Sequence, residues 1–534
     1  MKLSSLSKTS LLILICFGID KVIAILRQLI IARQFGLSVE LDVFNVANNL
    51  PDMLFILISG GAMAMVIIPV LTEVNELETQ ERAWKVFSSV INLAFIVSLV
   101  LAVIIAIFAG PIVRSELGIA PGFSADQQIH VVNMMRLNLI ATIIFSISGL
   151  VMGGLQANRK FLLPALAPIL YNLGQIFGAL ILSPSQPYRF LGVDLPAFGM
   201  GIYGLTTGVI IGALLHLLIQ IPGLIRLNFR WTPGFHFNDP YVRKILRILV
   251  PRVLTVFFVQ LIFIIRDNLA SRLETGSVTA LSYGYMFQQL PETLIGTALG
   301  TAILPSLSLF MSEKKFESFR NTYLIACRLA ISLSIGMTVI MGLGLGPIFN
   351  WVFDFTASET NLLIWTLRGF LVGLTGHCLL EVVNRSFYAQ QDAAVPLIGT
   401  LINLAVYIGA GLALYRPLNA PGISLTDSLA FTVQAIVLIL IMKVDPAKRA
   451  RWFKKLDRFR NKRPDEQLAV APQFGSVVPR SLLGGAAAAL VLYASMNLPL
   501  FGLDNLVKSM IGIGAAFLIY VPFIVPEIKA LRQF

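Results

Sequence analysis

Hydrophobic residues recur along the chain in runs of 20 to 30 residues, separated by short polar segments rich in proline and glycine. About 20 apolar residues suffice for a helix to cross a hydrocarbon core roughly 30 Å thick, so each run predicts a transmembrane helix. Fourteen runs are found, at 10–35, 41–70, 86–112, 129–155, 161–183, 197–225, 246–270, 279–311, 322–353, 361–388, 394–415, 421–442, 480–500 and 505–526. The pattern predicts an all-α polytopic membrane protein of about 14 transmembrane helices.

Composition agrees with lipid as the solvent. Of the 534 residues, 56% are hydrophobic and only 13% are charged, and the mean hydropathy is +0.81. Ordinary soluble domains carry roughly 25% charged residues. Cys16, Cys327 and Cys378 all lie inside apolar runs without ligand spacing, so we expect buried free thiols and no metal. The first run holds charges and lacks a small-residue cleavage site, which indicates a retained helix and not a signal peptide.

The net charge of +13 comes mainly from short loops between the spans, which argues against nucleic-acid binding. If the N-terminus is cytoplasmic, 30 of the 41 Lys and Arg residues fall in the tails and alternate loops on that side. The positive-inside rule then predicts a multi-pass membrane protein with both termini in the cytoplasm. The densest basic run, Lys443 to Arg463, is expected to be a solvated linker and topology anchor.

Two short motifs repeat at nearly equal offsets. Leu50-Pro51-Asp52 is matched by Leu290-Pro291-Glu292, and Ala157-Asn158 with Pro164 is matched by Ala389-Gln390 with Pro396. Both pairs lie six spans apart, which predicts a parallel repeat of two six-helix lobes, typical of alternating-access transporters. The predicted domains are an N-terminal lobe at 1–226, a C-terminal lobe at 227–443, a basic cytoplasmic linker at 444–479, and two extra spans at 480–534.

Charged residues inside the spans are the candidate site, because a charge at the bilayer centre usually faces a cavity or a partner. The first span carries Lys21, Arg27 and Arg33, and Asp42 opens the second. We expect Arg27 and Arg266 to line a central cavity and attract an anionic head group, since guanidinium binds phosphate bidentately. The alternative is that these cations pair with carboxylates and lock helices together.

The seventh span contains Arg266 and Asp267 side by side. Adjacent residues point in different directions on a helix, so these two charges are not expected to neutralise each other. Asp267 and Asn403 are weak candidates for a coupling-cation site built from oxygen ligands.

The tenth span holds Arg368, His377, Glu381 and Arg385. The spacing of Glu381 and Arg385 predicts a structural ion pair, and joint titration of His377 with Glu381 is the less favoured alternative. No nucleotide-binding loop, metal-ligand cluster or nucleophile motif occurs in the sequence, so we expect a transporter and not an enzyme, without cofactors. Transport would then be driven by the membrane potential or by a monovalent cation.

Several stretches resemble the MurJ (MviN) family, within the superfamily of multidrug, oligosaccharidyl-lipid and polysaccharide exporters. They are Arg27 to Gly36, Asp42 to Pro51, Ala157 to Asn172, Gly296 to Ser308 and Ser386 to Pro396. The resemblance covers essentially the whole chain and implies 14 helices, a cationic central cavity between two lobes, and a groove beside the last two spans for an undecaprenyl tail. It implies flipping of lipid II, an undecaprenyl-pyrophosphate-linked peptidoglycan precursor, from the inner to the outer leaflet. Lys21, Arg27, Arg33 and Asp42 match charged positions of the family.

The chain also departs from the family pattern. Phe55 and Ile56 stand where relatives commonly carry an Arg pair, Gly60 replaces an acidic residue, and Tyr285-Met286 replaces an Asp-Arg pair. Arg266 occupies a position that is usually neutral and is a candidate replacement for the lost cations.

The leading hypothesis is therefore a lipid II flippase, taken as a monomer. Its expected partners are the undecaprenyl-pyrophosphate-linked substrate and membrane lipid, with cell-wall synthesis proteins as further candidates. The alternatives are an exporter of another polyprenyl-linked saccharide of the O-antigen type, a drug/cation antiporter, and a membrane scaffold for cell-wall enzymes.

Overall fold

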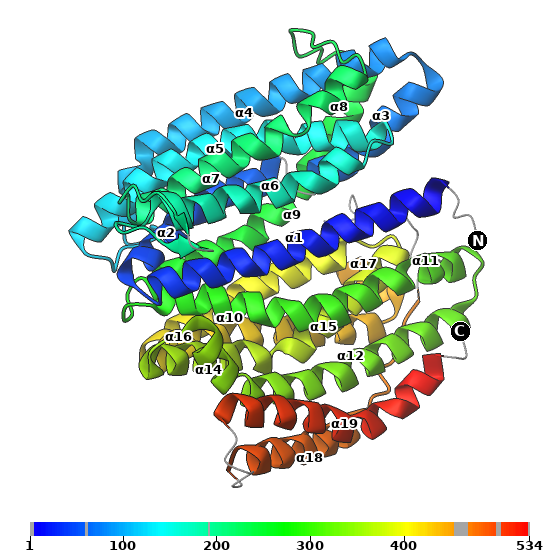
Figure 1. Ribbon diagram of the computed structural model, residues 1–534. Helices are drawn as coiled ribbons and strands as arrows, with labels where there is room; N and C mark the ends of the chain where they lie inside the picture. Colours follow the sequence, from blue (N-terminus) through cyan, green and yellow to red (C-terminus); the bar gives the residue numbers. More distant parts are fainter. Residues whose placement is uncertain (1–4, 59–61, 191–192, 453–467, 498–503, 532–534) are drawn as a thin grey trace. The chain divides into compact units, whose positions relative to one another are not determined.

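The computed structural model describes residues 5–58, 62–190, 193–452, 468–497 and 504–531. Nearly all of these residues are helical (Figure 1). The chain divides into two compact units, unit 1 at Met1–Gly276 and unit 2 at Ser277–Phe534. An all-α membrane protein, as the apolar pattern predicts, is therefore confirmed.

Unit 1 holds nine α-helices, a short π-helix and a two-stranded hairpin among its described residues. They are α1 (Ser5–Phe35), α2 (Val39–Ile58), α3 (Ala62–Leu77), α4 (Gln80–Arg114), α5 (Ala125–Ala157), α6 (Leu162–Phe177), the π-helix η1 (Gly178–Leu182), β1 (Arg189–Phe190), β2 (Val193–Asp194), α7 (Ile202–Leu218), α8 (Ile221–Arg226) and α9 (Pro240–Ala270). The two strands pair antiparallel in the α6–α7 connection. Helix α9, the seventh predicted span, packs on α2, α3 and α4.

All the regular secondary-structure elements among the described residues of unit 2 are helices. Its helices are α10 (Ser277–Glu292), the π-helix η2 (Thr293–Thr297), α11 (Ala298–Ser312), α12 (Phe316–Gly344), α13 (Gly346–Phe353), α14 (Ala357–Val372), α15 (Leu374–Ala389), α16 (Ala394–Lys443), α17 (Pro446–Trp452), α18 (Val477–Asn497) and α19 (Asn505–Leu531). The division into lobes at residue 226 stays a prediction.

Eleven helical segments of the described chain are long and apolar enough to cross a membrane. One of them, α16, has 50 residues and is broken at Asn419, where the backbone leaves the helical region at φ 52°. At about 1.5 Å per residue, α16 is long enough for two crossings. Helices α1 and α9 have 31 residues each and are more charged than the eleven. The ten other segments, the two halves of α16, and helices α1 and α9 together make up the 14 predicted spans.

The predicted repeat has a backbone counterpart in each unit. Helix α5 ends at Ala157 and is followed by Arg159 at φ 57°, and α15 ends at Ala389 and is followed by Gln391, also at φ 57°. The turn hydrogen bonds match as well: the N–H groups of Lys160 and Asp392 donate to the carbonyls five residues earlier, at 2.9 and 3.0 Å. The same sequence motif thus ends a helix in the same way twice, which confirms a parallel repeat.

Helix starts follow local capping chemistry. The Ser124 hydroxyl accepts from the Gln127 backbone N–H while the Gln127 side chain accepts from the Ser124 N–H, a capping box that begins α5. Asp239 caps α9 by accepting from Tyr241 N–H at 2.9 Å, with Pro240 at the first helical position. These caps lie in the polar segments between predicted spans.

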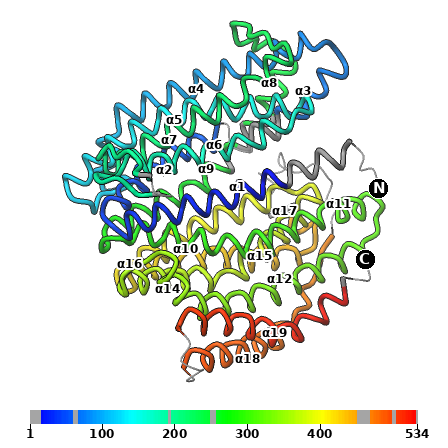
Figure 2. Tube along the Cα trace, viewed as in Figure 1, coloured from blue at the N-terminus to red at the C-terminus, as the bar shows by residue number. Residues whose placement is uncertain are grey.

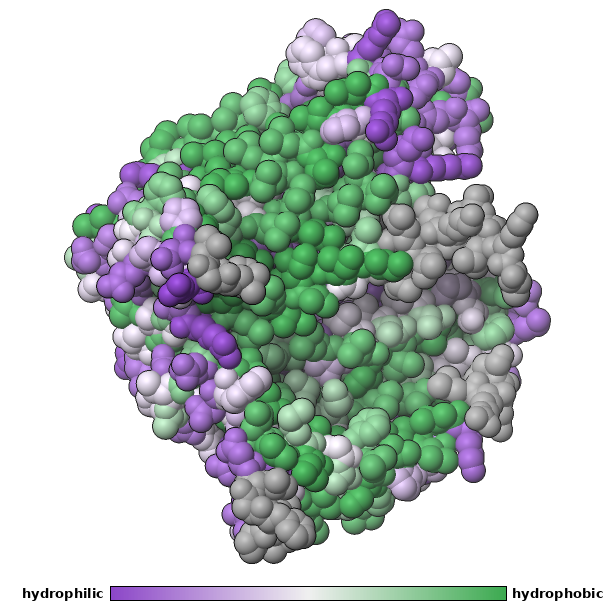
Figure 3. Space-filling view, in the orientation of Figure 1, coloured by the Kyte–Doolittle hydropathy of each residue, from purple (hydrophilic) through white to green (hydrophobic). Residues whose placement is uncertain are grey.

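Side chains on the outside of unit 1 are apolar over the middle of the helices. Along α4, for example, Val100, Val103, Ile107 and Phe108 are all exposed. Figure 3 shows this region in green, with hydrophilic residues at the two ends of the helices. A continuous apolar patch of this kind marks a surface that faces lipid in a membrane protein.

The two extra C-terminal helices, α18 and α19, pack on each other and on α12 in unit 2 (Figures 1 and 2). The Tyr520 hydroxyl on α19 donates to the Ser332 carbonyl on α12 at 2.6 Å. Gly336 leaves room for the Tyr520 ring, since a side chain there would meet it. These spans are therefore built into unit 2 and are not loosely attached.

The basic run after α16 is less solvated than expected. Most of it, 453–467, lies outside the described residues, but Arg449 on α17 is fully buried. Its Nε lies 3.8 Å from Asp392 Oδ2, and its guanidinium lies over the Phe387 ring at 5.3 Å. The prediction of a solvated linker is wrong at Arg449, because a buried carboxylate at the end of α15 needs a counter-charge.

Candidate substrate site

Arg27 lies in the second half of α1 and contacts α6. Its Nη1 donates to Asn172 Oδ1 at 2.9 Å. The Asn172 side-chain amide in turn donates to Asp20 Oδ1, also at 2.9 Å. Asp20 lies about two turns before Arg27 on α1. Because Asp20 accepts only, it fixes which way the Asn172 amide faces and thereby aims the carbonyl oxygen at Arg27.

The guanidinium keeps unused donor capacity. Arg27 Nε is buried and has no hydrogen-bond partner among the described residues. Asp52 on α2 and Tyr171 on α6 lie within electrostatic range of Arg27. A buried cationic donor left unsatisfied costs free energy, so this position favours an anionic oxygen atom as an additional partner.

Helix α6 presents Asn172 because it approaches α7 very closely. Gly174 on α6 and Gly178 at the start of η1 face Gly208 and Gly212 on α7, and a side chain at any of the four would meet the backbone of the opposite helix. Small residues at a membrane helix interface allow this approach and give tight van der Waals packing. The fixed α6–α7 pair therefore supports the Asn172 contact.

The other charged residues predicted for the first two spans have different environments. The Lys21 and Arg33 side chains are exposed on α1. Asp42 is 3% exposed, and its Oδ2 accepts from the Gly276 backbone N–H at 2.6 Å. Gly276 has φ 87°, a conformation that side-chain-bearing residues rarely adopt. Asp42 therefore also has a structural role, tying the start of α2 to the end of unit 1.

Arg266 and Asp267 neutralise each other, which corrects the sequence-based prediction. Both Nε and Nη2 of Arg266 lie 3.0 Å from Asp267 Oδ1. The two side chains are 12% and 0% exposed, so leaving either charge unpaired would be costly. The prediction considered only the directions of the two Cα–Cβ bonds. The Arg side chain is long enough to reach the carboxylate of the adjacent residue all the same. Arg266 also lies over the Phe263 ring at 5.2 Å.

Asp267 serves a second contact, between α9 and α2. Its Oδ2 accepts from the Asn49 side-chain amide at 2.6 Å, and the same amide donates to the Phe263 carbonyl at 3.2 Å. Asn403, in unit 2, is 1% exposed, and neither its Oδ1 nor its Nδ2 has a hydrogen-bond partner among the described residues. A coupling-cation role for Asp267 and Asn403 stays a prediction.

The predicted pair in the tenth span is confirmed. Arg385 Nη2 lies 3.2 Å from Glu381 Oε2 on α15. The closest charged partners of His377 are Asp427 on α16 and Glu292 on α10. Joint titration of His377 with Glu381 stays a prediction. Sequence spacing finds partners on the same helix, whereas these two come from other helices.

Aromatic packing occupies positions where the family usually carries charge. The Phe55 ring packs on Phe145 at 5.2 Å between centroids, and Tyr285 packs edge-on against Phe370 at 5.8 Å. Gly60 lies outside the described residues. Phe55 and Tyr285 therefore make apolar contacts at positions where the resemblance leads us to expect charged side chains.

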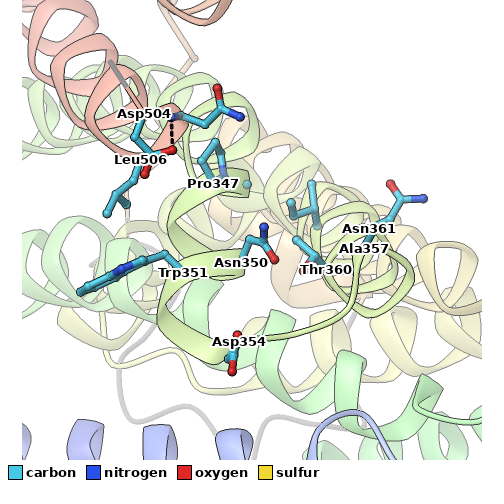
Figure 4. Close-up of a pocket in the computed structure, with 12 residues that line it drawn as sticks. Pro347, Asn350, Trp351, Asp354, Ala357, Thr360, Asn361, Asp504 and Leu506 are labelled. Carbon is cyan, nitrogen blue, oxygen red and sulfur yellow. Dashed lines mark hydrogen bonds between the residues drawn. The ribbon is translucent and has the colours of Figure 1, made fainter. Parts of the chain in front are cut away.

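A pocket of about 640 Å³ lies elsewhere, in unit 2, between α13, α14 and the start of α19 (Figure 4). Asn350 and Thr360 lie next to each other in it, Asp354 follows α13, and Asp504 precedes α19. None of its lining residues is Lys or Arg. An acidic lining repels a pyrophosphate, so this pocket does not fit the anionic substrate that Arg27 suits.

Sequence reasoning missed the residues that orient the charges. Asn172 and Asn49 are polar amides inside apolar spans, and each contacts a predicted charged residue on another helix. Asn172 ends the family-like stretch Ala157 to Asn172 but carries no charge, so the search for charged residues passed over it. Buried amides in apolar runs are the signal that would have found both.

Two repeated helical bundles, buried charges on the spans and a lipid-facing apolar surface define a multi-pass membrane transporter. The sequence model of the lipid II flippase MurJ family matches residues 31–457. The chain belongs to the MurJ family.

Curated relatives carry the same name. The chain is 28% identical to the lipid II flippase MurJ of Burkholderia cenocepacia over 79% of this chain and 81% of that protein. It is 26% identical to the probable lipid II flippase MurJ of Haemophilus influenzae, over 79% and 83%.

Solved structures agree on the fold. A lipid II flippase MurJ in an inward closed conformation matches with a TM-score of 0.75 and 21% identity, over 98% of this chain and 99% of that one. An inward-facing multidrug resistance transporter of the MATE family, in the MOP superfamily, matches with a TM-score of 0.63 and 17% identity, over 84% and 99%. The MATE structure matches 84% of this chain, against 98% for the MurJ structure, which agrees with the two additional spans of this chain.

Proposed function

We propose that this chain moves lipid II from the inner to the outer leaflet of the bacterial cytoplasmic membrane by alternating access, as a transporter without a catalytic step. Membership of the MurJ family and relatives named lipid II flippases support this substrate. The observation that carries the proposal is the partly unsatisfied Arg27 guanidinium in the first span.

Arg27 suits a pyrophosphate for three reasons. Its planar fork offers parallel N–H donors that match two phosphate oxygens, it stays protonated at any physiological pH, and it is more weakly hydrated than Lys. Asn172 and Asp20 orient the guanidinium from one side, and the buried Nε has no hydrogen-bond partner among the described residues, so the guanidinium is not saturated by protein contacts. Lys21 and Arg33, about 9 Å away along α1 in either direction, extend the positive charge toward both membrane surfaces.

Orientation and energetics are part of the proposal. The 30 of 41 basic residues on one side support cytoplasmic termini. We take the chain as a monomer driven by the membrane potential or a monovalent cation, since each charge moved is worth roughly 2.3 kcal/mol per 100 mV.

An exporter of another polyprenyl-linked saccharide is the second candidate. It is favoured by one observation, the aromatic packing of Phe55 where the family resemblance leads us to expect an Arg, which lowers the positive charge available to a head group. A drug/cation antiporter is disfavoured because Arg27 would repel a cationic drug.

Complementation of a MurJ-depleted bacterium tests the proposal. Growth should be restored, and lipid II should become accessible to an externally added enzyme that cleaves its head group. Membrane insertion without restored lipid II exposure would reject lipid II as substrate, and mass spectrometry of the copurified lipid would then identify the alternative.

A further inference from the structure

Unit 2 contains a buried cluster of three ionisable side chains from three helices. His377 on α15 lies between Asp427 on α16 and Glu292 at the end of α10. Its Nε2 is 2.9 Å from Asp427 Oδ2, and its Nδ1 is 3.7 Å from Glu292 Oε1. The side chains are 2%, 8% and 19% exposed. Each helix belongs to a segment that spans the membrane.

The backbone around the cluster brings the three helices unusually close. A side chain at Gly373 would meet Ser428, and one at Gly376 would meet Thr432, so α16 lies very close to the residues that immediately precede His377. Glu292 directly precedes the π-helix η2, whose Gly296 lies against Cys378. Single π-helical turns inside α-helices are frequent at functional sites, because they change which residues face a neighbouring helix.

The remaining contacts orient the cluster. Gln288 Nε2 donates to Glu292 Oε2 at 3.1 Å, and the Phe431 ring stacks on the imidazole at 3.9 Å between centroids. The imidazole hydrogen-bonds to Asp427 through Nε2, whereas its Nδ1 lies 3.7 Å from Glu292, within ion-pair distance. Both nitrogens carry a proton, and the ring is attracted to both carboxylates, only when the imidazole is protonated.

The charges do not balance in that state. One imidazolium and two carboxylates leave a net charge of −1 inside the membrane, where an uncompensated charge is expensive. One additional proton makes the cluster neutral. We propose that His377, Glu292 and Asp427 together form an intramembrane site that binds and releases one proton during the transport cycle.

Neighbouring groups do not supply the missing positive charge. On α15, Arg385 pairs with Glu381 at 3.2 Å, and Cys378 is buried. On α12, Tyr323 and Cys327 interact with each other, and on α14 Arg368 donates to the Gly342 carbonyl at 2.8 Å. Helix α11 and η2 carry no titratable side chain. The cluster therefore titrates as one unit whose proton is shared among its members.

A proton fits the geometry better than a metal cation. The His377 ring occupies the space between the carboxylates, and the Asp427 oxygen nearest to it already accepts from the ring. No group of three or more His, Cys, Asp or Glu side chains in the described part of the chain is arranged to hold a metal ion.

Proton binding at this cluster does not depend on which substrate the chain transports. The role of the proton in the transport cycle does rest on the proposed function as a lipid II flippase. Glu292 lies at the junction of α10 and η2, and Asp427 lies in the half of α16 that follows the break at Asn419. Neutralising the cluster weakens the ion-pair attraction among α10, α15 and α16, so protonation alters the packing of these helices.

Infrared difference spectroscopy of the purified full-length chain tests the site without substrate. Spectra recorded at mildly acidic and mildly alkaline pH should differ by the carbonyl stretch of one buried carboxylic acid. Glu292→Gln or Asp427→Asn should remove that signal, while Glu292→Asp should keep it at a shifted frequency. Glu527→Gln is the control, because Glu527 is also a buried carboxylate of unit 2 but pairs with Arg480 on α18.

A signal that is absent from the wild type, or that survives in both Glu292→Gln and Asp427→Asn, overturns the proton site. Loss of the signal on adding Na⁺ at constant pH also overturns it, in favour of a metal cation.

In proteoliposomes, a pH gradient should change lipid II exposure by up to about tenfold per pH unit in the wild type, and should have no effect in Glu292→Gln. If the wild-type chain exposes no lipid II while the infrared signal titrates, the proposed function fails and the proton site stands.

Discussion

At the scale of single residues, Arg27 is the group on which substrate binding depends. Arg27→Ala removes a cationic donor whose hydrogen bonds to an anion are worth about 1.5–3 kcal/mol, so lipid II exposure in complemented cells should fall at least about tenfold. Arg27→Lys keeps the charge without the planar fork and should retain partial activity. Expression and insertion should be unchanged in both. Full complementation by Arg27→Ala would remove the phosphate-binding role.

Variants of Arg266 show whether this residue binds the substrate or only stabilises the fold by pairing with Asp267. Arg266→Ala leaves Asp267 buried without a counter-charge, which should destabilise the chain by about 3–5 kcal/mol. The double variant Arg266→Gln/Asp267→Asn carries no net unpaired charge and should recover most of the thermal stability in detergent. If the double variant is stable but inactive, Arg266 has a direct role in transport. If it is stable and active, the pair is structural.

At the scale of elements, the α6–α7 contact supports Arg27 through Asn172. Gly208→Ala places a Cβ 2.8 Å from Gly178 Cα and 2.9 Å from the Gly174 carbonyl oxygen. Overpacking of this kind costs about 1–3 kcal/mol, so the variant should unfold at a lower temperature and lose transport activity. Gly110→Ala on α4 is the matched control, since its Cβ meets no described atom within 4 Å. Equal stability of the two variants would contradict the role of this contact.

The helices themselves were predictable from the sequence, whereas their contacts were not. Apolar runs, caps such as Ser124 with Gln127, and the repeated turns at Arg159 and Gln391 depend on local chemistry. The pair Glu381–Arg385 follows from spacing on one helix. The partners of Arg27, Asp267 and His377 come from helices far away in the sequence, and only tertiary packing decides them.

At the scale of the whole molecule, the charge distribution predicts which loops face the cytoplasm. Cys16, Cys327 and Cys378 are buried, so background labelling of the wild-type chain should be low. Ser185→Cys, in the predicted outer loop between α6 and α7, should react with a membrane-impermeant maleimide in intact spheroplasts. Lys314→Cys, between α11 and α12, should react only after the membrane is permeabilised. The opposite pattern would invert the topology.

The resemblance to the MurJ family extends over the chain and could be recognised from stretches such as Gly296 to Ser308, and the family match at 31–457 agrees with it. The head group is less predictable, because it depends on how many cations line the cavity. Phe55 stands where the resemblance leads us to expect an Arg, which lowers that number in this chain.

The most direct measurement of the central claim is lipid II translocation by the purified chain in proteoliposomes. Lipid II placed in one leaflet should reach the other at a rate that depends on the amount of chain, and Arg27→Ala should reduce that rate at least about tenfold. Translocation no faster than in protein-free vesicles, by a folded wild-type chain under both an imposed membrane potential and a pH gradient, would contradict the account.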